Sequence, residues 1–426
     1  MKTVGLITEY NPFHNGHLYH IEKAKELTGA DRVVIIMSGD YVQRGMPALL
    51  SKHHRAHMAL SCGASVVIEL PVCYASGSAE YFALGAVAIL DGLGCIDSLC
   101  FGSECGDLEQ LDRISRLLVS EPGSYRLLLQ NALKSGASFP AARCLALKEL
   151  TGDTSISEVM SDPNNILGIE YLKALQRLNS SIVPVTLKRQ ACNYHDTTLQ
   201  AHMSSASAIR NTLKQLSIPQ ISGNFGENAI NTSSQTWQLL KSQLPDEVFQ
   251  ILQNAWNTSC PVEPDDFSLL LKYRLLGETA SSLCAYQDVS PELANRIIRC
   301  RNNFQSYEQF CELLKTKELT YSRISRSLLH ILLSITKEDM ALYRSTSCSY
   351  ARVLGFCREH TDILHKMKEH SSIPIITKLT QTESLSPAAL RMLNQTTFAS
   401  DLYESVITDK FGGSFINEHQ KQLIRI

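Results

Sequence analysis

The fold is most clearly indicated by one N-terminal segment, Val4-Gly5-Leu6-Ile7-Thr8-Glu9-Tyr10-Asn11-Pro12-Phe13-His14-Asn15-Gly16-His17-Leu18. Its first part, Val4–Thr8, is apolar and predicts a buried strand, and the residues from Gly16 to Thr28 predict a helix. The turn between them carries two histidines in the pattern His-x-Gly-His. An open parallel sheet binds its ligands at such strand-to-helix turns, so we expect the functional site here.

Strands and helices continue to alternate along the first half of the chain. Strands are predicted at Arg32–Met37, Ser65–Leu70, Ser98–Phe101 and Val183–Leu187, and helices at Ser51–Cys62, Ser78–Leu90, Asn165–Leu178 and Ser205–Gln215. This order predicts an α/β domain with a Rossmann-like parallel sheet and helices on both faces. We place this domain at residues 1–220.

Beyond residue 235 the apolar residues recur at helical spacing. Helices are predicted at Thr236–Gln243, Asp266–Leu276, Pro291–Arg301, Tyr307–Lys315 and Ser322–Ser334. We therefore predict a mainly helical domain over residues 235–426, joined to the first by a Ser- and Asn-rich linker, Ile221–Gln235. A late strand candidate, Ile373–Leu379, predicts that the C-terminal part packs back on the first domain.

The composition is that of a globular protein. The 426 residues are 44% hydrophobic and 19% charged, with a formal net charge of −2, which excludes long disorder and a uniformly basic coat. The apolar N-terminal stretch is too short for a signal peptide, and no apolar run reaches the about 18 residues of a membrane span. The 13 cysteines include no Cys-x-x-Cys pair, which favours reduced thiols. We expect a cytoplasmic protein without a membrane segment.

The two histidines suit chemistry on a nucleotide. Displacement at the α-phosphorus of ATP develops negative charge on phosphate oxygens, and His14 and His17 at a helix N-terminus can donate hydrogen bonds to that charge. Gly16 removes a side chain, so the nucleotide can approach the backbone. A turn with two surface histidines is the alternative interpretation. The position of the motif between a strand and a helix favours the nucleotide site.

A second segment, Ser204-Ser205-Ala206-Ser207-Ala208-Ile209-Arg210, opens a later helix. Serine hydroxyls and backbone N–H groups can hold phosphate oxygens while an arginine clamps them, so Ser205, Ser207 and Arg210 suit triphosphate binding. Taken alone, the segment fits an ordinary helix cap followed by an exposed arginine. Its combination with the His-x-Gly-His turn favours the ATP site.

With these motifs the chain resembles the tRNA(Met) cytidine acetate ligase family, within the His-x-Gly-His nucleotidyltransferase superfamily. The resemblance rests on Gly5–His17 and on the shorter segments Met37–Gly45, Glu69–Pro71, Ser78–Ala83, Phe101–Glu104 and Pro163–Gly168. It covers the whole chain, including the helical second half.

The resemblance implies that the parallel sheet is of the nucleotidyltransferase kind and that the protein is an ATP-dependent ligase. Such an enzyme activates acetate as acetyl-adenylate and acetylates the exocyclic amine of the wobble cytidine of elongator tRNA(Met), forming N4-acetylcytidine. Acetyl-CoA is not expected, because no pyrophosphate loop of an acetyltransferase is present. Mg²⁺ is expected on the ATP phosphates. No protein-ligated metal is expected, since His53-His54-x-x-His57 has no acidic or cysteine partner at suitable spacing.

The resemblance also implies the ATP contacts. They fall on Gly102, Asn165 and Arg189, and on the loop formed by Ile7, Thr8, Glu9, Tyr10, Asn11, Pro12, Phe13, His14, Asn15, Gly16, His17, Leu18, Tyr19 and His20. We expect His14 and His17 to be catalytic. Asp40, after a predicted strand, is a third candidate, which would position acetate or accept the proton of the attacking amine. A turn aspartate without a catalytic role is the alternative.

Candidate tRNA contacts lie in two places. Lys52 and Arg55 could face the phosphates of ATP or tRNA. Arg323 and Arg326, with Tyr321 nearby, could follow tRNA phosphates while the aromatic ring stacks on a base. The same residues fit a solvated helix face. Two other functions stay open at this point: a small-molecule adenylyltransferase with the same histidines, and a non-catalytic RNA-binding protein with a vestigial nucleotide site.

Overall fold

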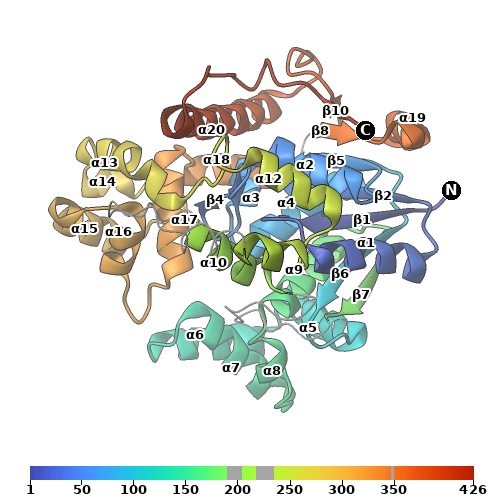
Figure 1. Cartoon of the computed structure of the whole chain (residues 1–426). Helices are drawn as coiled ribbons and strands as arrows, with labels where there is room; N and C mark the ends of the chain where they lie inside the picture. The colour runs from blue at the N-terminus through green and yellow to red at the C-terminus, as the bar shows by residue number, and fades with distance from the viewer. Residues whose placement is uncertain (190–203, 217–234, 347–349) are drawn as a thin grey trace.

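A mostly parallel sheet runs through the centre of the molecule (Figure 1). The computed structural model of the chain describes residues 1–189, 204–216, 235–346 and 350–426. The strands of the sheet are β1 (Thr3–Thr8), β2 (Arg32–Ser38), β5 (Val66–Leu70), β6 (Ser98–Ser103), β7 (Val183–Lys188), β8 (Ala351–Phe356), β9 (Ile375–Ile376) and β10 (Ile424–Arg425). Their order is β10-β8-β5-β2-β1-β6-β7, and β9 pairs with β8.

The central strand β2 is buried on both faces. Val33 and Ile35 belong to the core that contains side chains of helices α1 (Asn15–Thr28) and α2 (Lys52–Ser61). Val34 and Ile36 belong to the opposite core, with side chains of α4 (Ala79–Gly92) and α9 (Pro163–Leu178). This arrangement explains the continuous apolar run of β2, because a strand covered on both sides has no solvent face to make polar.

The strands and helices predicted in the first half are present, with bounds that differ by one or two residues. The parallel pairs β1–β2, β2–β5, β1–β6 and β6–β7 confirm the predicted α/β fold. A helical insertion between β6 and β7 was not predicted. It comprises α5 (Leu108–Ser120), α6 (Gly123–Lys134), α7 (Phe139–Thr151) and α8 (Ile156–Val159), at the bottom of Figure 1.

Three strands of the sheet come from the end of the chain. β8 pairs antiparallel with β5 and parallel with both β9 and β10. The predicted strand Ile373–Leu379 shortens to the two residues of β9. β8 escaped prediction because Arg352 interrupts its apolar run. That arginine is buried at 7% exposure, where Glu69 and Glu418 neutralise it.

Helices dominate the rest of the second half. They include α12 (Asp246–Ala255), α13 (Ser268–Leu276), α15 (Pro291–Cys300), α16 (Tyr307–Leu314), α17 (Tyr321–Leu332), α18 (Lys337–Thr346) and α20 (Pro387–Phe411). The predicted linker Ile221–Gln235, except its last residue, lies outside the described residues. Within the described ranges, no helix combines the length and the apolar character needed to cross a membrane.

Candidate nucleotide-binding site

A cavity of about 400 Å³ opens at the carboxyl ends of β1, β6 and β7. The turn between β1 and α1 forms one wall, and the starts of α9 and of α10 (Ala206–Leu216) contribute others. The hairpin of β3 (Tyr41–Val42) and β4 (Met46–Pro47) completes the lining. The cavity therefore lies where the sequence predicted the functional site, at the ligand-binding edge of the sheet.

His14 and His17 form the start of α1 together. His14 is the N-cap residue, and its Nδ1 accepts the N–H of Gly16 at 3.1 Å. His17 Nδ1 accepts the backbone N–H of His14 at 3.2 Å. Because Nδ1 is the acceptor in both rings, each neutral imidazole carries its proton on Nε2. The backbone thus fixes two N–H donors beside the cavity.

Burial keeps the cavity histidines neutral. It lowers the pKa of His14 to about 3, helped by the positive charges of Arg189 and Arg210. The pKa of His17 lies well below its ordinary value for the same reason, with His14 as the next cause. Burial and Arg189 lower the pKa of His20 to about 4. Near neutral pH, these side chains act as neutral hydrogen-bond donors.

The N-terminus of α10 meets the same cavity. Ser205 caps this helix by accepting the N–H of Ala208 at 3.1 Å. Arg210 donates to the carbonyl of Asn11 at 2.6 Å and to Ser207 Oγ at 3.1 Å, which ties α10 to the turn before α1. Two helix N-termini with an arginine between them form a site for anions, because their N–H groups and dipoles favour negative charge.

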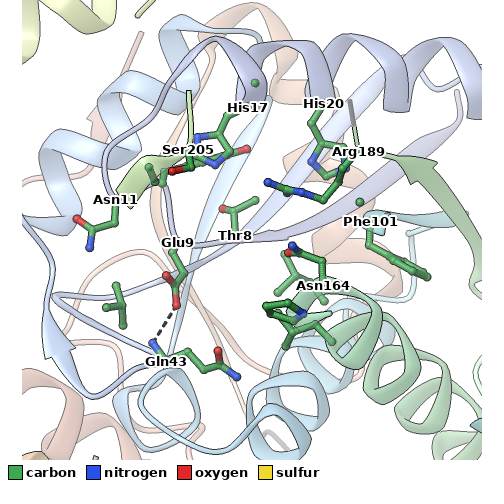
Figure 2. A pocket seen from close by; sticks show the side chains of 18 of the residues that line it. Thr8, Glu9, Asn11, His17, His20, Gln43, Phe101, Asn164, Arg189 and Ser205 are labelled. Atoms are coloured by element: carbon green, nitrogen blue, oxygen red, sulfur yellow. Dashed lines mark hydrogen bonds between the residues drawn. The ribbon is translucent and has the colours of Figure 1, made fainter. Parts of the chain in front are cut away.

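Gly102 on β6 and Arg189 after β7, both predicted ATP contacts, line the cavity. Arg189 follows β7 and its side chain lies against Gly102, where an added Cβ would approach Arg189 Cγ to 3.3 Å. Figure 2 shows Arg189 beside His20, with Phe101 and Asn164 below them. His20 Nε2 is buried and finds no hydrogen-bond partner among the described residues, so a bound ligand can supply one.

Most of the predicted β1–α1 loop lines the cavity. The lining residues are Ile7, Thr8, Glu9, Tyr10, Asn11, His14, Gly16, His17, Tyr19 and His20. Phe13 packs in the core and Leu18 packs against it. Asn15 donates to the carbonyl of Ser242 at 2.9 Å. These three residues and Pro12, all predicted ATP contacts, are not part of the cavity lining.

Asn165 stabilises the turn after β6. Its Oδ1 accepts the N–H groups of Glu104 and Cys105 at 2.9 and 3.1 Å, and the side chain is 1% exposed. The adjacent Asn164 lines the cavity. The family resemblance implied Asn165 as the ATP contact, whereas the cavity lining contains its neighbour Asn164.

Asp40, the third catalytic candidate, does not line the cavity, and its catalytic role stays a prediction. Asp40 is buried away from the lining, and its Oδ1 accepts the N–H of Lys52 at 2.7 Å. The carboxylate also lies 3.8 Å from Lys52 Nζ, inside a buried ion cluster. Asp40 therefore accepts the N–H of the first residue of α2, whose N-cap residue is Ser51.

Lys52 and Arg55, for which tRNA contacts were predicted, have fully buried side chains, which places them in the protein interior and not on its surface. Lys52 Nζ contacts Glu69 at 2.7 Å and Glu418 at 2.9 Å. The guanidinium of Arg55 donates to the carbonyls of Glu9, Ser38, Gly39 and Leu50. Arg55 thus holds together the loops that follow β1 and β2.

The helix that carries Tyr321, Arg323 and Arg326 packs on the β3–β4 hairpin. Ser325 donates to the carbonyl of Gly45 at 2.8 Å, which places α17 next to the cavity wall. Arg326 forms an ion pair with Asp288 at 2.9 Å. Arg323 and Tyr321 are half-buried. That Tyr321, Arg323 and Arg326 of α17 form a tRNA-binding surface stays a prediction.

Sequence reasoning assigned no role to several lining residues, among them Gln43, Arg44, Asn164 and Tyr171. Gln43, Arg44 and Asn164 lie within the motifs that carry the family resemblance, and this position could have marked them as candidate site residues. Within the described ranges, no group of three His, Cys, Asp or Glu residues could hold a metal ion.

The family model described as HIGH Nucleotidyl Transferase matches residues 1–416. The chain is 42% identical over 409 residues to the tRNA(Met) cytidine acetate ligase of Acetivibrio thermocellus, covering 95% of this chain and 94% of that protein. It is 41% identical to the same-named protein of Caldanaerobacter subterraneus subsp. tengcongensis, covering 95% of each. The chain belongs to the tRNA(Met) cytidine acetate ligase family.

Solved structures agree with this family membership. The crystal structure of apo Thermotoga maritima TmcAL matches with a TM-score of 0.90 and 31% sequence identity over 100% of both chains. The structure of the same protein bound with alpha-thio ATP matches with a TM-score of 0.88 at the same identity and coverage. The resemblance inferred from the sequence motifs is thereby confirmed.

Proposed function

We propose that this chain is an ATP-dependent tRNA(Met) cytidine acetate ligase. It activates acetate as acetyl-adenylate and acetylates the exocyclic amine of the wobble cytidine of elongator tRNA(Met), forming N4-acetylcytidine. One observation carries this proposal: the N-termini of α1 and α10 meet at a single cavity with His14, His17 and Arg210. The names of the relatives give the substrate.

In this proposal the histidine end of the cavity holds the ATP triphosphate. The Nε2–H groups of His14 and His17 and the guanidinium of Arg210 stabilise the charge that develops as pyrophosphate leaves. Ser205 and Ser207 add hydroxyls, and Arg189 lies across Gly102 at the β6 wall. The alpha-thio ATP held by Thermotoga maritima TmcAL supports ATP as the nucleotide.

Mg²⁺ enters this proposal bound to ATP. The side chains around the histidine end are imidazoles, hydroxyls and arginines, a poor set of ligands for Mg²⁺, which prefers carboxylate and water oxygens. The triphosphate itself fits the ion. When bound there, Mg²⁺ neutralises phosphate charge, and His14, His17 and Arg210 orient the phosphates.

The test supplies the purified protein with labelled acetate, ATP and Mg²⁺, with and without total tRNA, and without acetyl-CoA. Label in tRNA as acetylcytidine is the expected result. Acetate-independent ATP turnover without labelled RNA contradicts the proposal and favours a small-molecule adenylyltransferase. No turnover at all with intact tRNA binding favours a non-catalytic RNA-binding protein.

A further inference from the structure

One carboxylate faces the cavity. Among the described residues that line it, Glu9 is the single acidic side chain, and it follows directly after β1. Its Oε1 accepts the backbone N–H of Gln43 at 2.9 Å. Figure 2 shows Glu9 and Gln43 at one end of the cavity, apart from His17, His20 and Arg189 at the other.

The backbone around Glu9 is held firmly. Arg55 Nη1 donates to the Glu9 carbonyl at 2.7 Å and to the Ser38 carbonyl at 3.0 Å. Arg55 is fully buried, so these bonds are not exchanged for water. A carboxylate fixed at both its backbone and its side chain is suited to a catalytic task, because the geometry exists before the substrate binds.

The Glu9 end of the cavity adjoins the surface proposed to bind tRNA. Gln43 and Arg44 connect β3 to β4, and Gly45 of the same loop accepts the hydroxyl of Ser325 on α17. A nucleotide of a tRNA bound over α17 would therefore meet the hairpin side of the cavity. The phosphates of ATP belong at the cationic side.

We propose that Glu9 binds the exocyclic amine of the wobble cytidine and accepts its proton during acetyl transfer. This inference rests on the proposed function. A carboxylate is the ordinary partner of the cytosine N4 amine, since the amine only donates and the carboxylate only accepts. Glu9 thereby takes the role for which Asp40 was predicted.

The transfer step balances with Glu9 as the base. The N4 lone pair attacks the carbonyl carbon of acetyl-adenylate, and a C–N bond forms. The bond between that carbon and the adenylate oxygen breaks, and AMP leaves with the electron pair. One N4 proton moves to the Glu9 carboxylate and from there to solvent. The products are N4-acetylcytidine and AMP.

The test separates the two steps in the full-length protein with Glu9→Gln. Glutamine keeps an oxygen that can accept the Gln43 N–H, and it removes the base. The family resemblance places Glu9 among the ATP contacts, so exchange is measured at saturating ATP, where weaker ATP binding does not limit the rate. Under that condition acetate-dependent ATP–pyrophosphate exchange should stay within about threefold of the unmodified protein, because adenylation does not use the base. Single-turnover transfer from preformed acetyl-adenylate to tRNA(Met) should fall by about 100-fold or more.

Two variants serve as references. Glu22→Gln removes the same charge from the exposed face of α1, and both steps should keep their rates. Glu9→Asp retains a carboxylate and should recover part of the transfer rate. If Glu9 only positions the loop, the transfer rates should be reversed: Glu9→Gln, which keeps the side-chain length, should transfer faster than the shorter Glu9→Asp.

Several outcomes overturn the inference. A loss of exchange equal to the loss of transfer assigns Glu9 to adenylation or to Mg²⁺–ATP. Normal transfer by Glu9→Gln removes it from catalysis. Failure of the unmodified protein to acetylate tRNA is a different result, since it rejects the proposed function itself.

Discussion

The rings of His14 and His17 stack with their centroids 3.7 Å apart and their planes at 26°. Tyr10 packs against His17 at 4.8 Å between ring centroids, and Phe13 lies at 5.6 Å. The two imidazoles are therefore held by their hydrogen bonds to the backbone at the start of α1 and by the rings of Tyr10 and Phe13. Donors held in this way need little reorganisation when phosphate charge develops.

Replacing His17 with alanine removes one such donor. We expect acetate-dependent ATP–pyrophosphate exchange to fall by about 10²–10³-fold, the usual effect of losing one preorganised donor. Binding of tRNA should be unchanged. His57→Ala, at an exposed position of α2, is the matched control. Full activity of His17→Ala would remove this histidine from the mechanism.

The same histidines make stability depend on pH. The folded protein binds their protons only near the pKa of about 3 for His14 and about 4 for His20, whereas the unfolded chain binds them below about 6.5. The stabilisation of the folded state by these neutral histidines is complete above pH 6.5 and is lost as the pH falls toward 4. Each proton difference changes the free energy of unfolding by about 1.4 kcal/mol per pH unit.

Urea unfolding at pH 7.5, 6 and 5 measures this effect. The double variant His14→Gln/His20→Gln lacks the two groups and should lose less stability over this range. His54, whose pKa is also lowered to about 4 by burial, contributes equally to both proteins. An identical pH dependence of the two proteins would show that the cavity histidines are not kept neutral.

Gly45 lets α17 touch the β3–β4 hairpin. It has a positive φ of 76°, and an added Cβ would meet the backbone of Ser325 and Arg326. Gly45→Ala should lower the free energy of unfolding by about 1–3 kcal/mol, by backbone strain and overpacking. It should also slow acetyl transfer to tRNA more than ATP–pyrophosphate exchange.

A second glycine provides the control for this variant. Gly29 has a φ of 62°, and nothing lies within 4 Å of the position that an added Cβ would take. Gly29→Ala therefore carries the conformational strain without the contact with α17. If both variants lose the same stability and keep the same transfer rate, the contact of Gly45 with α17 has no functional importance.

Arg323 is the better test of the proposed tRNA surface, because Arg326 is already paired with Asp288. Arg323→Glu should weaken tRNA binding severalfold at low salt and lower the salt dependence of the affinity, with ATP–pyrophosphate exchange unchanged. Arg116→Glu, at an exposed arginine of α5, is the reference. Unaltered affinity at low salt would remove α17 from the tRNA surface.

The features predicted correctly from the sequence are those encoded locally. The strand before Glu9 and the helix after His14 follow from neighbouring residues. The differences concern side chains whose partners are distant in the chain. Lys52 is neutralised by Glu69 and Glu418, and no local pattern shows that these charges meet.

The partner of Asp40 was likewise not predictable from the local sequence, although it lies only twelve residues away. Asp40 follows β2 at the ligand-binding edge of the sheet, where a carboxylate was expected to reach the substrate. The side chain turns instead to the N–H of Lys52, because the start of α2 leaves that donor without a helical partner. Glu9, directly after the adjacent strand β1, faces the cavity.

The antiparallel pair of β5 and β8 has a consequence for synthesis of the protein. At translation rates of about 5–20 residues per second, the roughly 280 residues between Leu70 and Ala351 take about 14–56 s to appear. During that time the nascent chain exposes an apolar strand edge, Val66–Leu70, which can pair with other chains. Productive folding of this enzyme therefore depends on what shields that edge on the ribosome.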